Sequence, residues 1–314
     1  MLILLDLLTL LLLFIALGWS ADFVVKKIKY LGAVLKIRLF AFGILLGFIT
    51  SLPELSLGIN ATIDGVTALS VGNLLGGMIV MLGLILGVSL IFNKKVATDG
   101  RLTTLIPTIT VIFSPILLGL DGEYDLLDGL IMIGLYMGLI FFLYRLNHFK
   151  NHTSIEITDR DKVGKSIILA IIGIIGVIIP SHFILETTLN LLNYFQVSQL
   201  VIGLIIFSIG TNLPEISIAI TSWRKKSSEL SLSHLLSSSF SNVLILGVLA
   251  FMRPIVFDTN SAFWIVTIFL GVILMLFAYF YCSGKKMDRR EGIILFIVYV
   301  LFIIINLYSI IKAQ

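Results

Sequence analysis

Two glutamates follow prolines inside long apolar segments, in two copies of one short peptide. The first copy reads Thr-Ser-Leu-Pro-Glu at 50–54, and the second, 161 positions later, reads Thr-Asn-Leu-Pro-Glu at 211–215. A proline cannot donate to the carbonyl four residues earlier, and its ring displaces the carbonyl three residues earlier. The carbonyls freed in this way would be those of Ile49, Thr50, Gly210 and Thr211. A dehydrated cation beside Glu54 and Glu215 would satisfy these carbonyls and both charges, so the pattern predicts an ion site.

The composition places these peptides in a membrane protein. Hydrophobic residues make up 58% of the chain, charged residues make up 13%, and the mean hydropathy is +1.10. Most of the apolar segments approach the roughly 20 residues that cross a bilayer. A broken helix at membrane depth is tolerated only where it faces protein or a wet cavity, which again favours a site at the two prolines. We therefore expect an all-α membrane protein with ten transmembrane helices, approximately at 3–25, 33–61, 70–92, 102–120, 126–144, 166–191, 200–221, 230–251, 261–282 and 291–311.

The basic residues predict the orientation of these helices. All 22 Lys and Arg residues except Arg253 and Lys312 fall on one side of the ten-helix arrangement. Because cytoplasmic loops carry an excess of Lys and Arg, both termini are expected outside the cytoplasm of a prokaryotic cell membrane. The excess of basic residues is then explained by the orientation of the helices in the membrane, and it gives no reason to expect nucleic-acid binding. The first apolar run is expected to be a retained helix and not a signal peptide. The single cysteine, Cys282, excludes an intrachain disulfide, so helix packing must hold the fold.

The repeated peptide divides the chain into two halves. Helices 1–5 occupy residues 1–145 and carry the first copy on helix 2, whereas helices 6–10 occupy 166–314 and carry the second on helix 7. Residues 146–165 form the expected cytoplasmic linker. Five is an odd number, so the halves enter the membrane from opposite faces. Such inverted repeats are a transporter architecture, with the substrate site near the midplane where broken helices meet.

The likeness between the halves extends beyond the prolines. Ser56 aligns with Ser217, and the stretch 70–77 on helix 3 aligns with 231–238 on helix 8. Small residues on such helices allow close backbone approach. Close packing of helix backbones is therefore the expected role of five small residues: Gly72, Gly76, Gly77, Ser233 and Ser237. Three oxygen-bearing side chains on helix 8 exceed what packing needs and are candidate ligands: Ser238, Ser241 and Asn242.

The paired proline motifs, each followed by a Gly/Ser-rich helix, resemble the alpha repeats of the cation/calcium antiporter superfamily, above all its sodium/calcium exchanger branch. The resemblance covers the whole ten-helix layout, with the specific motifs at about 43–87 and 203–247. It implies that Glu54 and Glu215 bind calcium and that the backbone carbonyls of Thr50 and Thr211 complete the shell. It also implies roles at coupling-ion sites for Ser51, Asn212, Ser238 and Asn242.

Helix 3 departs from the family pattern, because Gly77 stands where the family has serine and Met81 where it has asparagine. The second half also has Ser233-His234 in place of Gly-Asn, which the first half keeps as Gly72-Asn73. Calcium takes about six to eight oxygens, which the remaining groups could still supply. A thioether is a poor ligand for a hard cation, so sodium coupling is expected to be weakened. The alternative is proton coupling, in which protons compete with the metal for two neighbouring carboxylates in a low-dielectric site.

The sequence thus predicts a secondary active antiporter that exchanges calcium for sodium by alternating access between helices 2, 3, 7 and 8. A proton/calcium antiporter, or an exchanger for another cation, is the alternative. A channel is disfavoured because no filter-like run of carbonyls appears, and an intramembrane aspartyl protease is disfavoured because the paired acids are glutamates. The chain has no P-loop, GxSxG or HExxH motif, so we expect no enzyme activity and no cofactor. The expected partners are inorganic cations and lipid, with no obligatory protein partner.

Several other polar residues leave two interpretations open. Asp22 could line an access path or pair with Lys26 at the interface, and His234 could be proton-sensitive or hydrogen-bonded at a helix end. His182 and Glu186 are expected at the headgroups or, less favoured, at an ion entrance. The remaining acids are interpreted as solvated charge on the outer face: Asp6, Asp121, Glu123, Asp125 and Asp128.

Overall fold

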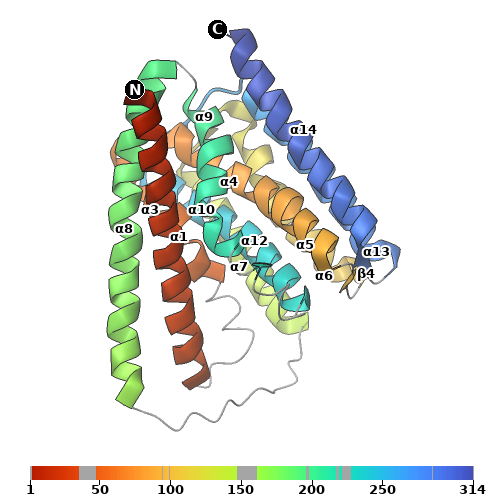
Figure 1. The fold of residues 1–314 in the computed structure, drawn as a ribbon. Helices are drawn as coiled ribbons and strands as arrows, with labels where there is room; N and C mark the ends of the chain where they lie inside the picture. The colour runs from red at the N-terminus through yellow and green to blue at the C-terminus, as the bar shows by residue number, and fades with distance from the viewer. Residues whose placement is uncertain are drawn as a thin grey trace.

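Two long helices form one side of the molecule. The structure is a computed structural model that describes residues 2–34, 47–93, 95–98, 100–146, 161–195, 198–216, 219–220, 228–284 and 286–313. Helix α1 (Leu2–Val34) and helix α8 (Asp161–Phe195) pack against each other along their length (Figure 1). Helix α8 begins at Asp161, so residues 161–165, expected in the linker, are helical, and 147–160 lie outside the described residues.

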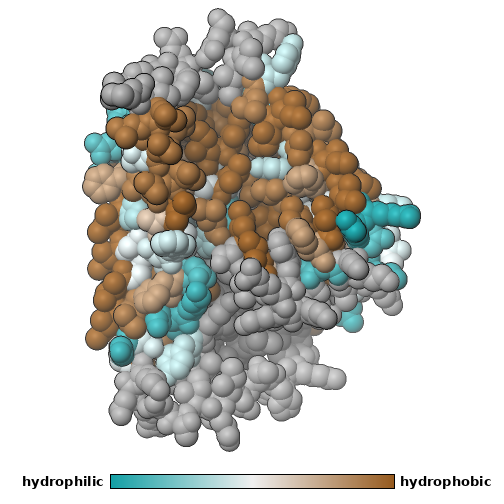
Figure 2. Space-filling model, in the orientation of Figure 1, coloured by the Kyte–Doolittle hydropathy of each residue, from teal (hydrophilic) through white to brown (hydrophobic). Residues whose placement is uncertain are grey.

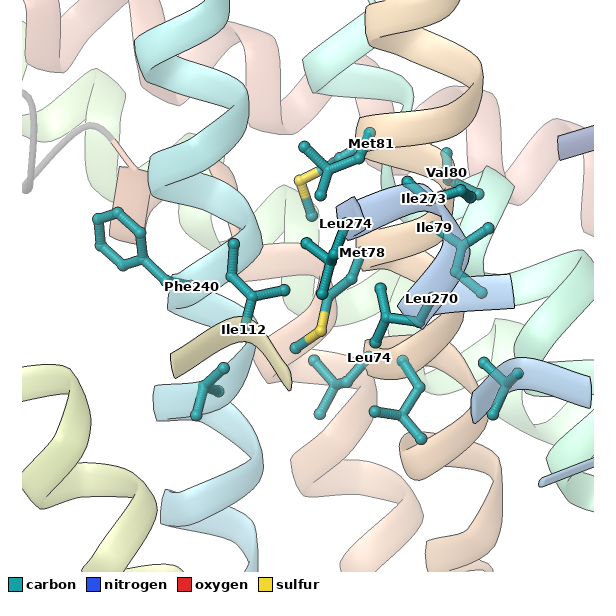
Figure 3. Packing of buried hydrophobic residues seen from close by; sticks show 14 of the residues in the cluster. Leu74, Met78, Ile79, Val80, Met81, Ile112, Phe240, Leu270, Ile273 and Leu274 are labelled. Carbon is teal, nitrogen blue, oxygen red and sulfur yellow. The ribbon is translucent and has the colours of Figure 1, made fainter. Parts of the chain in front are cut away.

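The centre of the molecule is one nearly continuous helix. Helix α4 (Thr67–Ile79) passes through a π-helical turn η1 (Val80–Ile85) into α5 (Leu86–Asn93). Every α4 side chain except Ala68 is buried. Figure 3 shows Leu74, Met78 and Met81 among apolar side chains of the surrounding helices. Helix α4 is therefore buried on nearly every side, as expected for a helix enclosed by others, although it carries the polar residues Thr67, Ser70 and Asn73.

Five further helices complete this part of the molecule, and the pairs α7–α12 and α5–α14 make alike contacts. The helices are α6 (Leu102–Leu118), α7 (Leu126–Leu146), α12 (Ser228–Met252), α13 (Ser261–Ser283) and α14 (Arg289–Ala313), with a 3-10 turn η2 (Gly119–Asp121) after α6. Helix α7 packs on α12, where a Cβ at Gly247 would lie 2.9 Å from the Gly129 carbonyl oxygen. Helix α14 packs on α5, where a Cβ at Gly87 would lie 3.0 Å from the Gly292 carbonyl oxygen. Both pairs depend on glycine for close approach.

Each of these helix pairs carries a two-stranded antiparallel ribbon beside it. Strand β1 (Lys95–Ala97) follows α5 and pairs with β4 (Lys286–Asp288), which precedes α14. Strand β2 (Glu123–Tyr124) precedes α7 and pairs with β3 (Ile255–Val256), which follows α12. The two ribbons thus repeat one arrangement, and each pairs a strand of the first half with a strand of the second half.

Tyr124 fixes the second ribbon against α6. Its hydroxyl donates to the Pro115 carbonyl oxygen at 2.7 Å, and its ring lies 5.0 Å from that of Phe257. Burial raises the pKa of Tyr124 well above its usual range, and the nearby Asp128 and Asp121 add to this effect. The phenol therefore stays protonated and keeps its role as a donor.

The two proline-containing segments are interrupted where the sequence predicts. Residues 47–50 are helical, Ser51 forms a turn with φ −87° and ψ 12°, and α3 (Leu52–Ile63) follows with Pro53 in its first turn. In the second half, α9 (Gln199–Ile202), η3 (Gly203–Phe207) and α10 (Ser208–Thr211) lead to Asn212, whose φ is −83° and ψ 12°. Helix then resumes at 213–216. The two breaks share one backbone geometry, and the same Leu-Pro sequence follows each.

A π-helical turn explains a one-residue shift between the halves. Gly77 aligns with Ser238 at an offset of 161, whereas Gly87 and Gly247, which make alike contacts, differ by 160. The turn η1 lies between Gly77 and Gly87, and a π-turn accommodates an extra residue. Helix α12 has no such turn within Ser228–Met252. Sequence alignment alone did not predict this feature.

The outer surface suits lipid. Eight helices of the described part are long and apolar enough to cross a membrane, and Gln199–Thr211 is a shorter apolar helix. Figure 2 shows apolar residues across a broad belt, with hydrophilic residues at the lower left and right edges. The eight spans match expected helices 1, 3–6 and 8–10. Expected helices 2 and 7 are described only in part, since 35–46, 217–218 and 221 lie outside the described residues. The protein is an all-helical, multi-pass membrane protein.

Candidate cation-binding site

The two helix breaks place two carboxylates in the interior. Glu54 lies in the first turn of α3 and Glu215 in the segment 213–216, and each side chain is only 1% exposed. The carboxylates lie close enough to repel each other electrostatically. None of their four oxygens accepts a hydrogen bond from any residue that the structure describes. Burying an ionised carboxylate without a partner is costly, so this pair calls for a positive charge between the segments.

Each carboxylate faces the break of the other half. Thr211 lies beside Glu54, whereas Thr50 and Ser238 lie beside Glu215, in each case without a hydrogen bond of ordinary geometry. The hydroxyls of Thr50 and Ser238 are 3.2 Å apart and share a hydrogen bond. The first break is therefore joined to α12 at the place where the carboxylates meet.

The second break is joined to α4 in the corresponding way. Thr211 Oγ1 donates to Asn73 Oδ1 at 3.1 Å, and both residues are buried. Sequence comparison treated Asn73 only as a position that keeps the family pattern. Its presence on the wholly buried face of a membrane helix was the signal that it contacts another polar group.

The side chains of Ser51 and Asn212 are held by the same kind of hydrogen bond, but they differ in the polar atoms that remain unbonded. Ser51 Oγ donates to the Gly47 carbonyl oxygen at 3.0 Å, and Asn212 Nδ2 donates to the Ser208 carbonyl oxygen at 2.7 Å. Both bonds run to the residue four positions earlier. Asn212 retains a second polar atom, Oδ1, which has no partner among the described residues.

Helix α12 contributes a second amide. Asn242 Nδ2 donates to the Leu74 carbonyl oxygen at 3.1 Å, while its Oδ1 lacks a described partner. Ser241 is equally buried, and its Oγ has no hydrogen-bond partner among the described residues. Tyr136 of α7 lies beside it. The oxygens of α12 that the sequence predicted as ligands are therefore inside the protein. Those of Ser241 and Asn242 lack a described partner, whereas Ser238 bonds to Thr50.

Helix α4 lines the same region without side-chain oxygen at the two departing positions. A Cβ at Gly77 would lie 2.8 Å from Asn242 Nδ2 and 3.2 Å from Asn212 Nδ2, and 3.9 Å from the Met81 methyl carbon. Met81 is fully buried, and its sulfur accepts a 3.5 Å hydrogen bond from Ser239 Oγ of α12. Figure 3 shows Met81 on the side of its helix that faces α12. The space that a serine at position 77 would occupy is thus already approached by two amides.

A separate polar cluster joins α3 to α8. The hydroxyls of Ser56 and Ser181 are 2.6 Å apart, and Asn60 Nδ2 donates to Ser181 Oγ at 3.1 Å. Sequence reasoning missed this cluster, although Ser56 and Asn60 lie one turn apart on an apolar helix. Ser217, the aligned counterpart of Ser56, lies outside the described residues.

The structure also describes the surroundings of the other predicted polar residues on α1, α8 and α12. Asp22 Oδ2 pairs with Lys26 Nζ at 2.6 Å, the interfacial arrangement that the sequence left open. His182 and Glu186 are exposed, and the His182 ring packs edge-on against Phe183. His234 lies in α12 with 9% of its side chain exposed.

The donor set fits a hard cation held by mixed oxygen groups. Among the described residues no three or more His, Cys, Asp or Glu side chains group together as a metal site would. Two carboxylates, hydroxyls, amide oxygens and the carbonyls near the breaks are instead the oxygen ligands that calcium and sodium accept.

Comparisons with known proteins identify similar membrane proteins. The chain is 26% identical over 262 residues to an uncharacterized membrane protein of Methanocaldococcus jannaschii, covering 81% of this chain and 82% of the relative. It is 23% identical to the sodium/calcium exchanger MaX1 of Methanosarcina acetivorans, covering 92% of this chain and 95% of the relative. Among solved structures, the sodium-calcium exchanger NCX_Mj soaked with sodium and strontium has the same fold, with a TM-score of 0.68. That alignment has 22% identity and covers 96% of this chain and 98% of the other.

The family model described as sodium/calcium exchanger protein matches residues 5–145 and 165–308. These two blocks contain both proline motifs and are separated by residues 146–164, which lie within the expected linker at 146–165. Exchangers are membrane antiporters that transport ions and are not enzymes. The chain belongs to the sodium/calcium exchanger protein family.

Proposed function

We propose that this protein is a secondary active antiporter that exchanges calcium for sodium by alternating access. The observation that carries the proposal is the pair Glu54 and Glu215, whose four oxygens are buried and lack hydrogen-bond partners among the described residues. A transported divalent cation would neutralise both charges. The site lies between expected helices 2, 3, 7 and 8, which correspond to 47–63, 67–93, 199–220 and α12.

Calcium would bind between the carboxylates, with backbone carbonyls of the breaks completing its shell. Glu54 and Glu215 supply up to four oxygens, and the carbonyls of Thr50 and Thr211 add two more. The total reaches the lower end of the roughly six to eight oxygens that calcium takes. The coupling-ion candidates are the polar side chains that surround this centre: Ser51, Asn212, Ser238 and Asn242. All four are buried.

The likeness between the halves supports an inverted-repeat arrangement of ten helices. Ser51 and Asn212 share one backbone geometry, and the α7–α12 and α5–α14 pairs repeat one packing arrangement. The start of α1 and the end of α14 lie at the same end of the molecule, as an even number of passes requires (Figure 1). We divide the chain into residues 1–145, a cytoplasmic linker at 146–165, and 166–314. The basic loops place both termini outside the cytoplasm.

Proton/calcium exchange is the second candidate, and Gly77 and Met81 are the observation that favours it. Neither residue offers an oxygen where the family has serine and asparagine, so α4 provides less for a sodium ion. When the divalent ion leaves, protons can bind to two neighbouring carboxylates in the interior.

Calcium uptake into proteoliposomes, under separately imposed sodium and proton gradients, tests these candidates. Saturable uptake that needs an outward sodium gradient supports sodium/calcium exchange. Uptake driven by a proton gradient without sodium supports the second candidate. Calcium flux that follows its own gradient with no counter-ion would exclude antiport.

A further inference from the structure

A polar contact joins the helix that carries Glu54 to α8 of the other half. Ser56 lies two residues after Glu54 on α3, and its hydroxyl oxygen is 2.6 Å from that of Ser181 on α8. Asn60 Nδ2, one turn further along α3, donates to the same Ser181 oxygen at 3.1 Å. The three residues Ser56, Asn60 and Ser181, which we call the α3–α8 contact, thus tie α8 to the helix of the first carboxylate.

The α3–α8 contact lies in otherwise apolar packing. Ser181 is fully buried, and Leu57 and Ala61 of α3 belong to the same apolar cluster as Ile184 and Leu185 of α8. Helix α8 has its main contacts with α1 and α3. Because hydroxyl and amide groups act as polar links between helices in such surroundings, these three residues favour one particular placement of α8 on α3.

The hydrogens of the contact have a defined direction. The Ser181 hydroxyl donates to the Ile178 carbonyl oxygen of its own helix at 2.7 Å. A serine hydroxyl has a single hydrogen, so Ser181 accepts from Ser56 while it donates to Ile178. Its oxygen accepts from Asn60 as well. Helix α3 therefore supplies two donors, and α8 supplies one oxygen that receives both.

The helices can separate here without leaving a buried donor unpaired. Ser181 keeps its bond to the Ile178 carbonyl oxygen, and Asn60 Nδ2 also donates to the Ser56 carbonyl oxygen of its own helix at 3.0 Å. The Ser56 hydroxyl can turn to a carbonyl one turn earlier, as serine does in helices. An unpaired buried donor would make separation costly, so these bonds within each helix make the contact reversible.

Serine recurs at both positions in the other half of the sequence. Ser20 of α1 precedes Ser181 by 161 positions, and Ser217 follows Ser56 by the same 161 positions that separate the two proline motifs. Ser217 lies outside the described residues. Apolar packing of helices gives no reason for serine to recur at both positions, whereas inverted repeats use equivalent elements on the two sides of the membrane.

We propose that the α3–α8 contact opens and closes in each transport cycle, and that Ser181 thereby sets the rate of calcium transport and not the affinity for calcium. This proposal rests on the proposed antiport function, because alternating access requires the packing around Glu54 to change between states. Ser181 is a positioning residue: it contacts the helix that carries Glu54 and acts on the cation only through that helix.

A cysteine pair tests whether the contact has to open. Ser56→Cys is combined with Ser181→Cys in protein whose single cysteine is replaced, Cys282→Ser, so that a mild oxidant can join the two sulfurs. The control pair is Glu123→Cys with Val256→Cys, opposite each other in β2 and β3, which also links the two halves. Loss of thiol labelling measures the cross-linked fraction. Calcium uptake into proteoliposomes under a sodium gradient is then compared before oxidation, after oxidation and after reduction.

Oxidation of the Ser56/Ser181 pair should reduce calcium uptake to background, and reduction should restore it. Thermal stabilisation of the detergent-solubilised, cross-linked protein by calcium chloride should persist, because the carboxylates stay in place. The control pair should transport equally well in all three conditions. Ser181→Ala, which removes the shared acceptor, should change the maximal uptake rate about threefold to tenfold and leave the half-saturating calcium concentration unaltered.

Four results would overturn the proposal. They are unchanged uptake in the cross-linked Ser56/Ser181 pair, absence of cross-linking under the oxidant, a changed half-saturating calcium concentration at an unchanged maximal rate in Ser181→Ala, and loss of calcium stabilisation together with uptake. The last result would mean that the contact only supports Glu54 statically. If the unaltered protein shows no counter-ion-dependent calcium uptake, the proposed function itself fails, which the cysteine variants do not decide.

Discussion

Thr50 and Ser238 are separated by 188 positions in the sequence, and their hydroxyl oxygens are 3.2 Å apart beside Glu215. This contact joins the break of the first half to α12 of the second. Both residues are fully buried, so the hydrogen bond holds its geometry without competition from water. The position of Glu215 is thereby tied to residues from both halves of the chain.

Replacing Ser238 by alanine should weaken cation binding without unfolding the protein. The change removes one hydroxyl beside Glu215 and leaves the Thr50 hydroxyl bonded only to Gly47. Loss of a typical hydrogen bond is worth about 0.5–1.5 kcal/mol, or up to roughly tenfold in the cation concentration that half-saturates transport. Ser114→Ala is the control, since that hydroxyl bonds within α6 to Val111. Equal effects of the two changes would show that Ser238 has only a packing role.

Removing either carboxylate should abolish calcium transport. In Glu54→Gln or Glu215→Gln, one charge is lost and one ligand is weakened, while a neutral amide is easier to bury than the carboxylate it replaces. We expect the variants to insert and to elute as folded protein in size-exclusion chromatography, with calcium uptake at background. Glu123→Gln, at an exposed position in β2, is the matched control and should transport normally. Near-normal uptake in either interior variant would reject a shared site.

Labelling of single cysteines should report the orientation. With Cys282 replaced by serine, a cysteine at Lys162 or Lys286 should react with a membrane-impermeant reagent only from the cytoplasmic side. A cysteine at Asp121 should react only from outside. The physical reason is the concentration of basic residues in the loops near the first two positions. Accessibility of the N-terminus from the cytoplasm would contradict the inverted-repeat arrangement.

Close packing of α7 on α12 should depend on glycine. A Cβ at Gly129 would lie 2.8 Å from the Gly247 carbonyl oxygen, so Gly129→Leu must push the helices apart. Overpacking of this kind costs about 1–3 kcal/mol, which should lower the thermal unfolding temperature in detergent. Gly134→Leu on the same helix is the control, because nothing lies within 4 Å of its Cβ position. Equal unfolding temperatures for the two variants would show that the contact is dispensable.

The structure changes the expected result of restoring a serine on α4. The family pattern predicts that Gly77→Ser and Met81→Asn return lost sodium ligands. In the structure, the new Cβ at position 77 would lie 2.8 Å from Asn242 Nδ2 and 3.2 Å from Asn212 Nδ2. The new side chain would therefore press on two amides that are held by the Ser208 and Leu74 carbonyl oxygens, so Gly77→Ser is expected to disturb the site as well as to add an oxygen.

The sequence by itself determined the features that depend on neighbouring residues. Composition and the length of apolar runs indicated a membrane protein, and the Leu-Pro pairs predicted the breaks at Ser51 and Asn212, since a proline restricts the residues just before it. The repeated motif also singled out Glu54 and Glu215, because a buried charge in an apolar segment has to be compensated wherever the chain goes.

Only the tertiary structure decided which residues of distant segments meet. Thr211 contacts Asn73, Ser56 contacts Ser181, and Asn212 occupies the space beside Gly77, and each contact depends on how two helices cross and rotate. The extra residue in η1 changes the direction in which side chains point from that place onward along the central helix. An alignment of the two halves with one fixed offset does not show this change. Proline effects act within one turn of the backbone, whereas side-chain complementarity depends on packing between helices that the chain brings together from far apart.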